Sequence, residues 1–304
     1  MLHKFRCLIL VMALCVTTTA NAEFGRPWPM FRHDMARSGV TAERLKMPLR
    51  QSWVFEPRHP PKPAWGDPPA GMVEGTLELR RVHFDDASQV VVADGAVYLG
   101  SSSEDKVFCL DLKSGAIRWT ALTEGPVRLA PMYSEERLYY GADDGYAYCL
   151  NAFSGKLIWK FHAAPENRRL LGNGRMISLW PIRTGVLVDG GDAFFGAGIH
   201  PSEGVFFYRL DARNGQVVWR QGASGERPHS AVSPQGYLLA TKEQIFFPLG
   251  RSQPTAFDRR DGSTVYDIPL KYQNWLKTAG GTFALLDAKG DLYTGTKNLA
   301  GYRA

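Results

Sequence analysis

The chain is poor in cysteine and in the residue patterns of metal and haem sites, and these absences narrow its functions. Its 304 residues include only 4 cysteines, and no two of them are adjacent. No Cys-x-x-Cys-His sequence is present, which argues against an attached c-type haem. The 7 histidines are scattered, with no pair at metal-ligand spacing. No nucleophile elbow or phosphate-binding glycine loop is found either, so a hydrolase is disfavoured.

Long apolar runs are also missing, apart from a short one at the start. Lys4 and Arg6 precede an apolar core over 7–16, and a small-x-small sequence ends at Ala22. This pattern is typical of an export signal and is too short to span a bilayer. We therefore expect cleavage after Ala22, a periplasmic or secreted protein and no transmembrane segment. A lipid anchor on Cys15 is the alternative.

The charge excess is small. The net charge of +6 falls to +4 when the two basic residues of the signal, Lys4 and Arg6, are removed. Charges of both signs are spread over the predicted turns, and no basic block is present. We expect no nucleic-acid partner. Amphipathic helical stretches are nearly absent as well, which favours an all-β protein.

One short phrase occurs four times in the chain. In each copy an apolar residue precedes Asp or Asn, Gly follows four positions later, and an aromatic residue stands four positions after the Gly. The copies begin 40, 60 and 47 residues apart. A period of about 40–50 residues with several short strands per repeat is typical of a β-propeller. The aromatic residues are Trp119, Trp159, Trp219 and Tyr266, and the glycines are Gly115, Gly155, Gly215 and Gly262.

Each position of the phrase has a physical role. The Asp or Asn ends a strand and can accept hydrogen bonds from the backbone of the turn that follows. The Gly tolerates the positive φ that a tight hairpin requires. The aromatic ring on the outgoing strand can bury roughly 150–250 Å² against a neighbouring sheet. We therefore predict that the aromatic residues dock successive blades.

The predicted fold is a β-propeller of four-stranded antiparallel blades. Asp-Gly pairs between apolar runs, as at Asp94 and Asp144-Gly145, predict two-residue hairpins. Three segments are expected: the signal 1–22, an extended lead-in 23–87 with one strand and a Pro-rich loop, and repeats over 88–304. The blades are placed at about 88–121, 127–161, 182–221 and 236–268, with a partial one at 275–304. At this spacing we predict an incomplete or open ring of five to six blades, in a chain that is part of a longer one.

The repeat resembles the PQQ-like (pyrroloquinoline quinone) repeat of the quinoprotein alcohol dehydrogenase-like superfamily. The phrase around Asp111, Gly115 and Trp119 is similar to the phrase that ends its Trp-docked blades, and the opening from Trp28 to Val40 is similar to the lead-in of many secreted members. The resemblance covers about 27–304. It implies a propeller fold and says little about activity, because this superfamily includes dehydrogenases and assembly scaffolds.

A quinoprotein dehydrogenase of this fold implies Ca²⁺ held by oxygen ligands beside the quinone, an Asp base and a disulfide between adjacent cysteines. This chain has no adjacent cysteine pair and no assignable calcium set. We expect no cofactor, with PQQ and calcium as the alternative. Outside the signal only Cys109 and Cys149 remain, and we expect two buried thiols because equivalent points on neighbouring blades are too far apart for a disulfide.

The step of 60 residues contains an insertion that is the candidate ligand or partner loop. Guanidinium groups beside an indole suit an anionic or planar aromatic ligand, although arginines that bond to carbonyls and to water explain the same pattern. The candidate residues are Arg168, Arg169, Arg175, Trp180 and Arg183.

Two functions stay open from the sequence. The first is an exported, non-catalytic scaffold that binds a protein or a cell-envelope ligand. The second is a PQQ-dependent oxidoreductase, similar to alcohol or sugar dehydrogenases, whose catalytic residues lie beyond this chain. The sequence names no catalytic, cofactor-binding or metal-binding residue.

Overall fold

The computed structural model describes residues 26–66, 84–222, 233–250, 254–266 and 282–295. Within these ranges the chain forms strands, turns and a short 3-10 helix, η1 (Pro201–Glu203). None of the described helical residues forms a span long and apolar enough to cross a membrane. The all-β prediction is confirmed. The predicted signal 1–22 lies outside the described residues.

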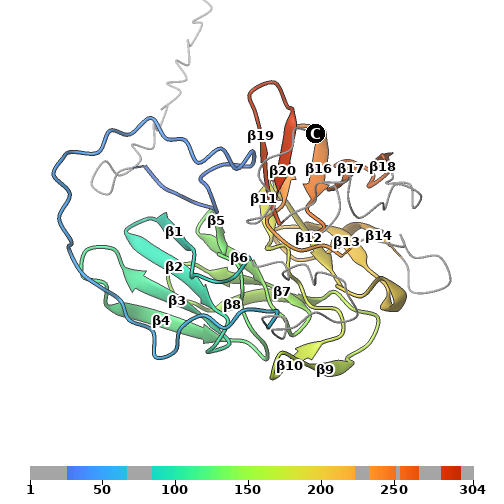
Figure 1. The fold of residues 1–304 in the computed structure, drawn as a ribbon, viewed down its shortest axis with the longest axis horizontal. Helices are drawn as coiled ribbons and strands as arrows, with labels where there is room; N and C mark the ends of the chain where they lie inside the picture. The colour runs from blue at the N-terminus through green and yellow to red at the C-terminus, as the bar shows by residue number, and fades with distance from the viewer. Residues whose placement is uncertain (1–25, 67–83, 223–232, 251–253, 267–281, 296–304) are drawn as a thin grey trace, which may run out of the picture.

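The architecture is built from antiparallel sheets of four strands, each a meander in which neighbours along the chain are neighbours in the sheet (Figure 1). The first two sheets hold β1 (Val90–Ala93), β2 (Ala96–Ser101), β3 (Lys106–Asp111) and β4 (Ile117–Leu122), then β5 (Met132–Ser134), β6 (Arg137–Gly141), β7 (Tyr146–Asn151) and β8 (Leu157–His162). The next two hold β11 (Leu187–Asp189), β12 (Asp192–Ala197), β13 (Phe206–Asp211) and β14 (Val217–Gln221), then β15 (Leu239–Ala240), β16 (Gln244–Phe247), β17 (Thr255–Asp258) and β18 (Thr264–Tyr266).

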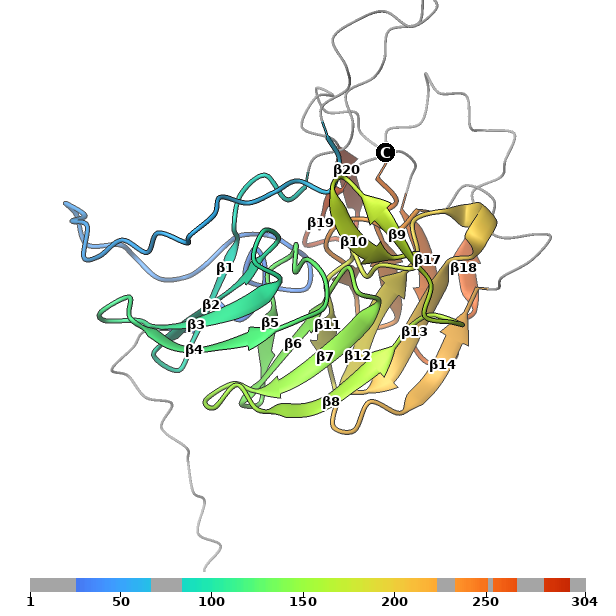
Figure 2. The ribbon, with the colours of Figure 1, turned by 90° about the horizontal axis from the view of Figure 1, so that it is seen from below.

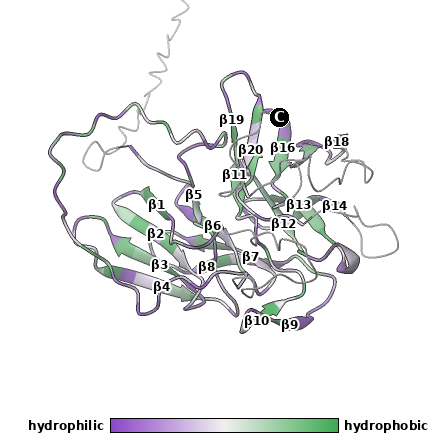
Figure 3. Cartoon of the chain, in the orientation of Figure 1, coloured by the Kyte–Doolittle hydropathy of each residue, from purple (hydrophilic) through white to green (hydrophobic). Residues whose placement is uncertain are grey.

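Two-stranded sheets complete the described structure. They are the hairpins of β9 (Arg169–Gly172) with β10 (Arg175–Ser178), and of β19 (Phe283–Leu286) with β20 (Leu292–Gly295). Figure 2 shows the four-stranded sheets fanning out like blades, with β4, β8 and β14 on the outer arc and β1, β5 and β11 nearer the centre. Hydrophobic residues gather on the strands and hydrophilic ones on many of the turns (Figure 3).

Tryptophan on the outer strand of one blade docks on glycine of the next. The indole of Trp159 lies so close to Gly215 that a β-carbon there would stand 2.9 Å from its Cδ2 atom. The indole N–H of Trp159 donates to the carbonyl of Ala212, at 2.9 Å, in the same turn. Equivalent contacts join Trp119 to Gly155 and Ala152, and Trp219 to Gly262 and Arg259. The fourth aromatic residue, Tyr266, pairs with Ala256 through its backbone, and its side chain is not described.

The lead-in supplies one more docking tryptophan. Trp53 lies against Gly115 of the first blade, where a β-carbon would stand 2.5 Å from Cε3, and its N–H donates to the carbonyl of Leu112 at 2.9 Å. Phe55 packs edge-on against Phe108 beside it, with ring centroids 5.2 Å apart. The one strand predicted in the lead-in, at 49–56, is not formed, because its residues join no sheet in the described structure. Its aromatic side chains dock on the first blade, and no described residue forms a backbone–backbone hydrogen bond with it.

Another part of the lead-in, residues 28–37, runs past the innermost strands of several blades. Trp28 pairs with Val92 of β1, and the carbonyl of Pro29 accepts from the N–H of Tyr133 in β5. Further on, the carbonyls of Met35 and Ala36 accept from Ala240 of β15 and Leu286 of β19. We call residues 28–37 the axial segment, because it ties together strands that belong to different blades.

The two cysteines outside the signal are free and buried, which confirms the prediction. Burial raises the pKa of the Cys109 thiol to about 11, and the pKa of the Cys149 thiol to about 11. Both stand on the third strand of their blades, opposite the docking tryptophans Trp119 and Trp159 in register. They are packing residues, because a protonated buried thiol is a poor nucleophile.

Candidate functional site

Buried polar side chains converge in the segments that lead into the innermost strands β1, β5, β11 and β15. Arg128, Arg183 and Gln235 each stand four residues before the first residue of β5, β11 and β15. Asp85 stands five residues before β1, and Asp143 lies in the turn between β6 and β7. All five side chains are buried. We call Asp85, Arg128, Asp143 and Arg183 the mouth cluster.

The mouth cluster is a chain of ion pairs across three blades. The Asp143 carboxylate accepts from Nε of Arg128 at 2.6 Å, and from Nε and Nη2 of Arg183 at 3.0 and 2.9 Å. The other end of the Arg128 guanidinium, Nη1, reaches Oδ2 of Asp85 at 2.7 Å. Because two carboxylates face two guanidinium groups, the cluster is close to neutral.

Burial and charge act against each other in this cluster. Burial by itself favours the neutral form of Asp143, but the guanidinium groups of Arg128 and Arg183 outweigh it and hold the pKa of that carboxyl below its usual value. For Asp85 burial wins over its single close guanidinium, and the pKa is raised. Asp143 is therefore the firmly ionised centre of the cluster.

A strap from the Pro-rich part of the lead-in, residues 59–66, covers the cluster. The carbonyl of Lys62 accepts from Nη1 of Arg128 at 2.9 Å, and the N–H of Ala64 donates to Oδ2 of Asp85 at 2.9 Å. The ring of Trp65 lies 5.4 Å from the Arg183 guanidinium, and its N–H donates to Oε1 of Gln235 at 2.8 Å. The strap thus closes the mouth with backbone and indole contacts.

One hydrogen-bonding position of the cluster is left without a partner. Nη1 of Arg183 is buried and forms no hydrogen bond with the described residues. A buried guanidinium N–H without an acceptor carries a cost of about 1–3 kcal/mol. The mouth therefore keeps the capacity to accept one more polar group, such as a water molecule or an anionic oxygen.

The five candidate residues of the insertion do not come together. Arg169 pairs with Glu124, and Arg175 pairs with Asp105 and donates to the carbonyl of Ser103 at 2.7 Å. The indole N–H of the buried Trp180 donates to the carbonyl of Glu203 at 2.8 Å. Arg168 is exposed and forms long ion pairs with Glu166 and Glu203, at 3.6 and 3.8 Å. Arg183 lies in the mouth cluster, where the indole beside it is Trp65. The insertion thus sends Arg168, Arg169 and Arg175 to surface pairs, Trp180 to the core and Arg183 to the mouth cluster.

Sequence reasoning missed most of the mouth cluster, although a signal for two members exists. Pro126-Val127-Arg128 and Pro181-Ile182-Arg183 repeat the same order shortly before an apolar strand. The partners Asp85 and Asp143 carry no comparable signal, because nothing local in the sequence relates them to these arginines.

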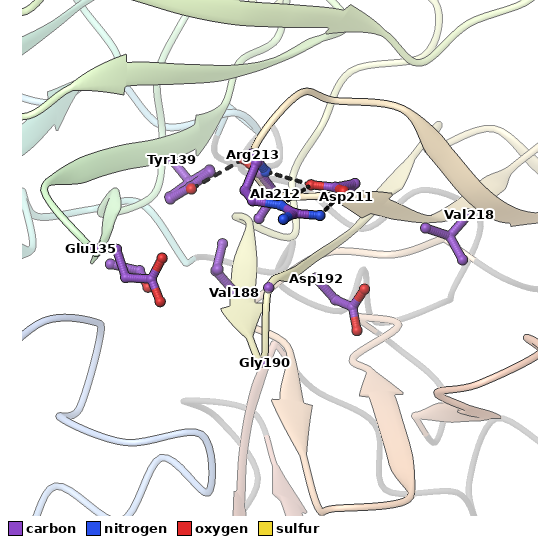
Figure 4. A pocket seen from close by; sticks show the side chains of 11 residues that line it. Glu135, Tyr139, Val188, Gly190, Asp192, Asp211, Ala212, Arg213 and Val218 are labelled. Atoms are coloured by element: carbon purple, nitrogen blue, oxygen red, sulfur yellow. Dashed lines mark hydrogen bonds and ion pairs between the residues drawn. The ribbon is translucent and has the colours of Figure 1, made fainter. Parts of the chain in front are cut away.

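A pocket of about 480 Å³ lies elsewhere, between the second and third four-stranded sheets. Figure 4 shows Glu135, Asp192, Asp211 and Arg213 around it. Asp211 forms an ion pair with Arg213 of the same turn at 2.8 Å, and Asp192 pairs with Arg209 at 2.8 Å. Asp192 and Asp211 are therefore already paired with arginines.

The described residues do not fit a quinone with calcium. Both carboxylates of the mouth cluster are bound by guanidinium groups, which repel a divalent cation at the same oxygens. Within the described ranges no three His, Cys, Asp or Glu side chains are placed to hold a metal ion. We derive no chemical step through such a cofactor.

Comparisons with known proteins fit this architecture. A family model described as outer membrane protein assembly factor BamB matches residues 67–204 and, overlapping them, 121–289. Tetrathionate hydrolase of Acidithiobacillus ferrooxidans is 26% identical over 173 residues, which are 53% of this chain and 30% of that protein. Quinoprotein ethanol dehydrogenase of Pseudomonas putida is 27% identical over 170 residues, 50% of this chain and 26% of that protein. The chain thus spans less than a third of the length of these relatives.

Solved structures of low sequence identity share the fold. A europium-containing methanol dehydrogenase superposes with a TM-score of 0.60 at 15% identity, over 90% of this chain and 55% of that one. The quinohemoprotein alcohol dehydrogenase of Comamonas testosteroni gives a TM-score of 0.59 at 15% identity, over 92% of this chain and 47% of that one. At this identity the likeness establishes a common fold alone.

Proposed function

The chain belongs to the family of the outer membrane protein assembly factor BamB, a family of PQQ-like repeat propellers. From this premise we propose that it is an exported, non-catalytic scaffold that binds a protein of the cell envelope. The face that we assign to binding is the one around the mouth cluster, where the strap and the hairpin β9–β10 lie.

The observation that carries the proposal is the state of the mouth cluster. Its ionisable groups are paired with one another: Asp143 with Arg128 and Arg183, and Asp85 with Arg128. A general base or a metal ligand needs a carboxylate with a free lone pair facing a ligand, and the strap covers these carboxylates. Breaking such a buried pair costs about 3–5 kcal/mol, so the cluster supports structure better than chemistry.

The contacts of the axial segment also support a structural role for the inner part of the protein. Phe31 stacks on Tyr237 at 3.9 Å, and the buried Arg37 donates from Nε to the carbonyl of Leu238 at 2.8 Å. Since the axial segment of the chain itself bonds to the innermost strands, we assign the loops and turns at the ends of the blades as the surface for partners.

A PQQ-dependent oxidoreductase is the second candidate. The quinoprotein ethanol dehydrogenase relative favours it, and it requires catalytic residues outside the described ranges. Purified protein is mixed with PQQ and Ca²⁺, quinone binding is followed by absorption, and ethanol oxidation is followed with an artificial dye acceptor. We expect neither binding nor turnover. Turnover that depends on both additions would replace the scaffold by the oxidoreductase.

The binding half of the proposal needs its own experiment. The full gene product is made in cells with a photo-crosslinking amino acid at Lys62, on the strap, or at Lys156, in a turn beside the outer strand β8. We expect a discrete product from Lys62 and not from Lys156, and direct binding of the identified protein once it is purified. Equal products from both positions, or none from either, contradict a binding face at the mouth. An amino terminus at Glu23 in the exported fraction would support the signal.

A further inference from the structure

The hairpin β9–β10, on the face that we assign to binding, has one strand edge to which no other described strand is bonded. Ser178 of β10 donates its N–H to the carbonyl of Asp143, which turns β10 toward the second blade. On β9, the carbonyl of Arg168 just before the strand accepts from Leu179, whereas no described residue bonds to the outward backbone of Leu171. Figure 1 shows the hairpin at the margin of the molecule, beyond β7.

The register decides which groups point outward. Asn173 and Gly174 form a two-residue turn, so that Gly172 and Arg175 are a hydrogen-bonded pair. The next pair, Leu171 and Met176, then directs its amides and carbonyls away from the partner strand. Among the described residues, none bonds to the N–H or the C=O of Leu171 at the outer edge of β9, and such an edge is the template for an added strand.

The side chains of the same pair are apolar and exposed. Leu171 is 71% exposed and Met176 is 53% exposed, and they lie opposite each other in register. The other face of the hairpin is anchored, because Ile177 is buried and Arg175 pairs with Asp105 of the first blade. The hairpin is thus fixed to the body of the protein and presents an exposed apolar pair next to its turn.

The charge of the hairpin selects the partner. Residues 166–178 contain three arginines and one acidic residue, Glu166. Arg169 pairs with Glu124, and Arg175 pairs with Asp105. Arg168 is 56% exposed, and its ion pairs with Glu166 and Glu203 are long, at 3.6 and 3.8 Å, so that neither is a direct hydrogen bond. A carboxylate from outside, at hydrogen-bond distance, can compete with these long pairs.

We infer that the outer edge of β9 receives an extended strand of a protein partner, which pairs with the backbone of Leu171, packs aliphatic side chains on Leu171 and Met176 and places a carboxylate on Arg168. This mode of recognition takes its affinity from backbone hydrogen bonds and its selectivity from alternate side chains. The inference rests on the proposed function, since it names how that scaffold holds its partner.

The test uses a labelled, end-blocked peptide of alternating valine and glutamate, with a valine–lysine peptide as its counterpart. Binding is measured by fluorescence anisotropy, and exchange of the Leu171 amide is followed by mass spectrometry. We expect the acidic peptide to bind at about 10–100 μM, to slow exchange at Leu171, and to bind at least tenfold more tightly than the basic peptide. Tenfold corresponds to about 1.4 kcal/mol.

Three variants separate the contributions. Leu171→Pro removes the outward N–H at an edge position that tolerates proline, and we expect it to abolish binding. Arg168→Glu is expected to weaken the acidic peptide at least tenfold without changing the far-UV circular dichroism. Leu122→Ser is the matched control, because Leu122 is 76% exposed on the outer strand β4, and it should leave binding unchanged.

Several outcomes would overturn the inference. They are binding that survives both Leu171→Pro and Arg168→Glu, the absence of peptide binding to folded protein, and binding to phosphatidylcholine vesicles instead of the peptide. None of them restores an enzymatic function, which only quinone-dependent turnover would do. Failure of the strand site and failure of the scaffold are therefore distinguishable.

Discussion

Replacing Gly215 by alanine tests the docking of one blade on the next. Gly215 has φ +74°, and a β-carbon there would lie 2.9 Å from Cδ2 and 3.1 Å from Cε3 of Trp159. Both contacts are too short for carbon atoms, so the indole must move. The variant therefore combines backbone strain with a displaced tryptophan.

The magnitude follows from these two effects. An alanine in the left-handed region costs about 1–2 kcal/mol. An indole that buries roughly 200 Å² loses about 2–3 kcal/mol if half of that area is exposed, and the bond from Trp159 to the carbonyl of Ala212 is worth about 1 kcal/mol. We expect Gly215→Ala to lower the free energy of unfolding by about 4–6 kcal/mol.

Gly190 provides the matched control. It has φ +60°, and an added β-carbon meets no atom within 4 Å. Gly190→Ala should therefore show the strain alone, about 1–2 kcal/mol. Urea unfolding followed by circular dichroism measures both variants.

A double variant isolates the contact. In a Trp159→Ala background the indole is absent, so Gly215→Ala should cost only the backbone strain. Our account of docking is refuted if Gly215→Ala and Gly190→Ala differ by less than about 0.5 kcal/mol, or if Gly215→Ala costs as much without the indole as with it.

Three further predictions concern the lead-in, the thiols and the mouth cluster. Trp53→Ala should lower the free energy of unfolding by about 2–3 kcal/mol. This is less than the loss of a fully buried indole costs, because Trp53 docks on Gly115 while staying partly exposed. Urea titration measures the change, and no loss of stability would mean that the lead-in is not part of the fold. Cys109 and Cys149, whose thiols have a pKa of about 11, should resist a thiol reagent at pH 8 in the native protein and both react in urea; rapid native labelling would contradict their burial. Asp143→Asn should cost about 3–5 kcal/mol and should flatten the acid limb of stability. The pKa of this carboxyl is lowered on folding, so it stabilises the native state above its unfolded pKa of about 4 and loses that contribution as the pH falls through the folded pKa. Thermal unfolding from about pH 6 down to about pH 2 measures the effect, and an unchanged acid limb would show that another group controls it.

Much of the fold was within reach of the sequence, and the mouth cluster was not. The strands around Asp111 and Gly115 follow from local turn chemistry and from alternation, both of which act over a few residues. The insertion that breaks the repeat contains the hairpin β9–β10, which is not among the strands predicted from the sequence, although Asn173-Gly174 is a two-residue turn signal.

The repetition of Trp119, Trp159 and Trp219 at equivalent places beside a turn glycine is already visible in the sequence, because each copy of the phrase carries its own strand, turn and ring. The contacts of Arg183 with Asp143 and Trp65 are seen only in the folded chain, since these residues belong to two different sheets and to the lead-in. Local spacing fixes what a blade is made of. Which charges neutralise one another at the mouth, and which edge stays open on β9, depends on how the blades and the lead-in are brought together in space.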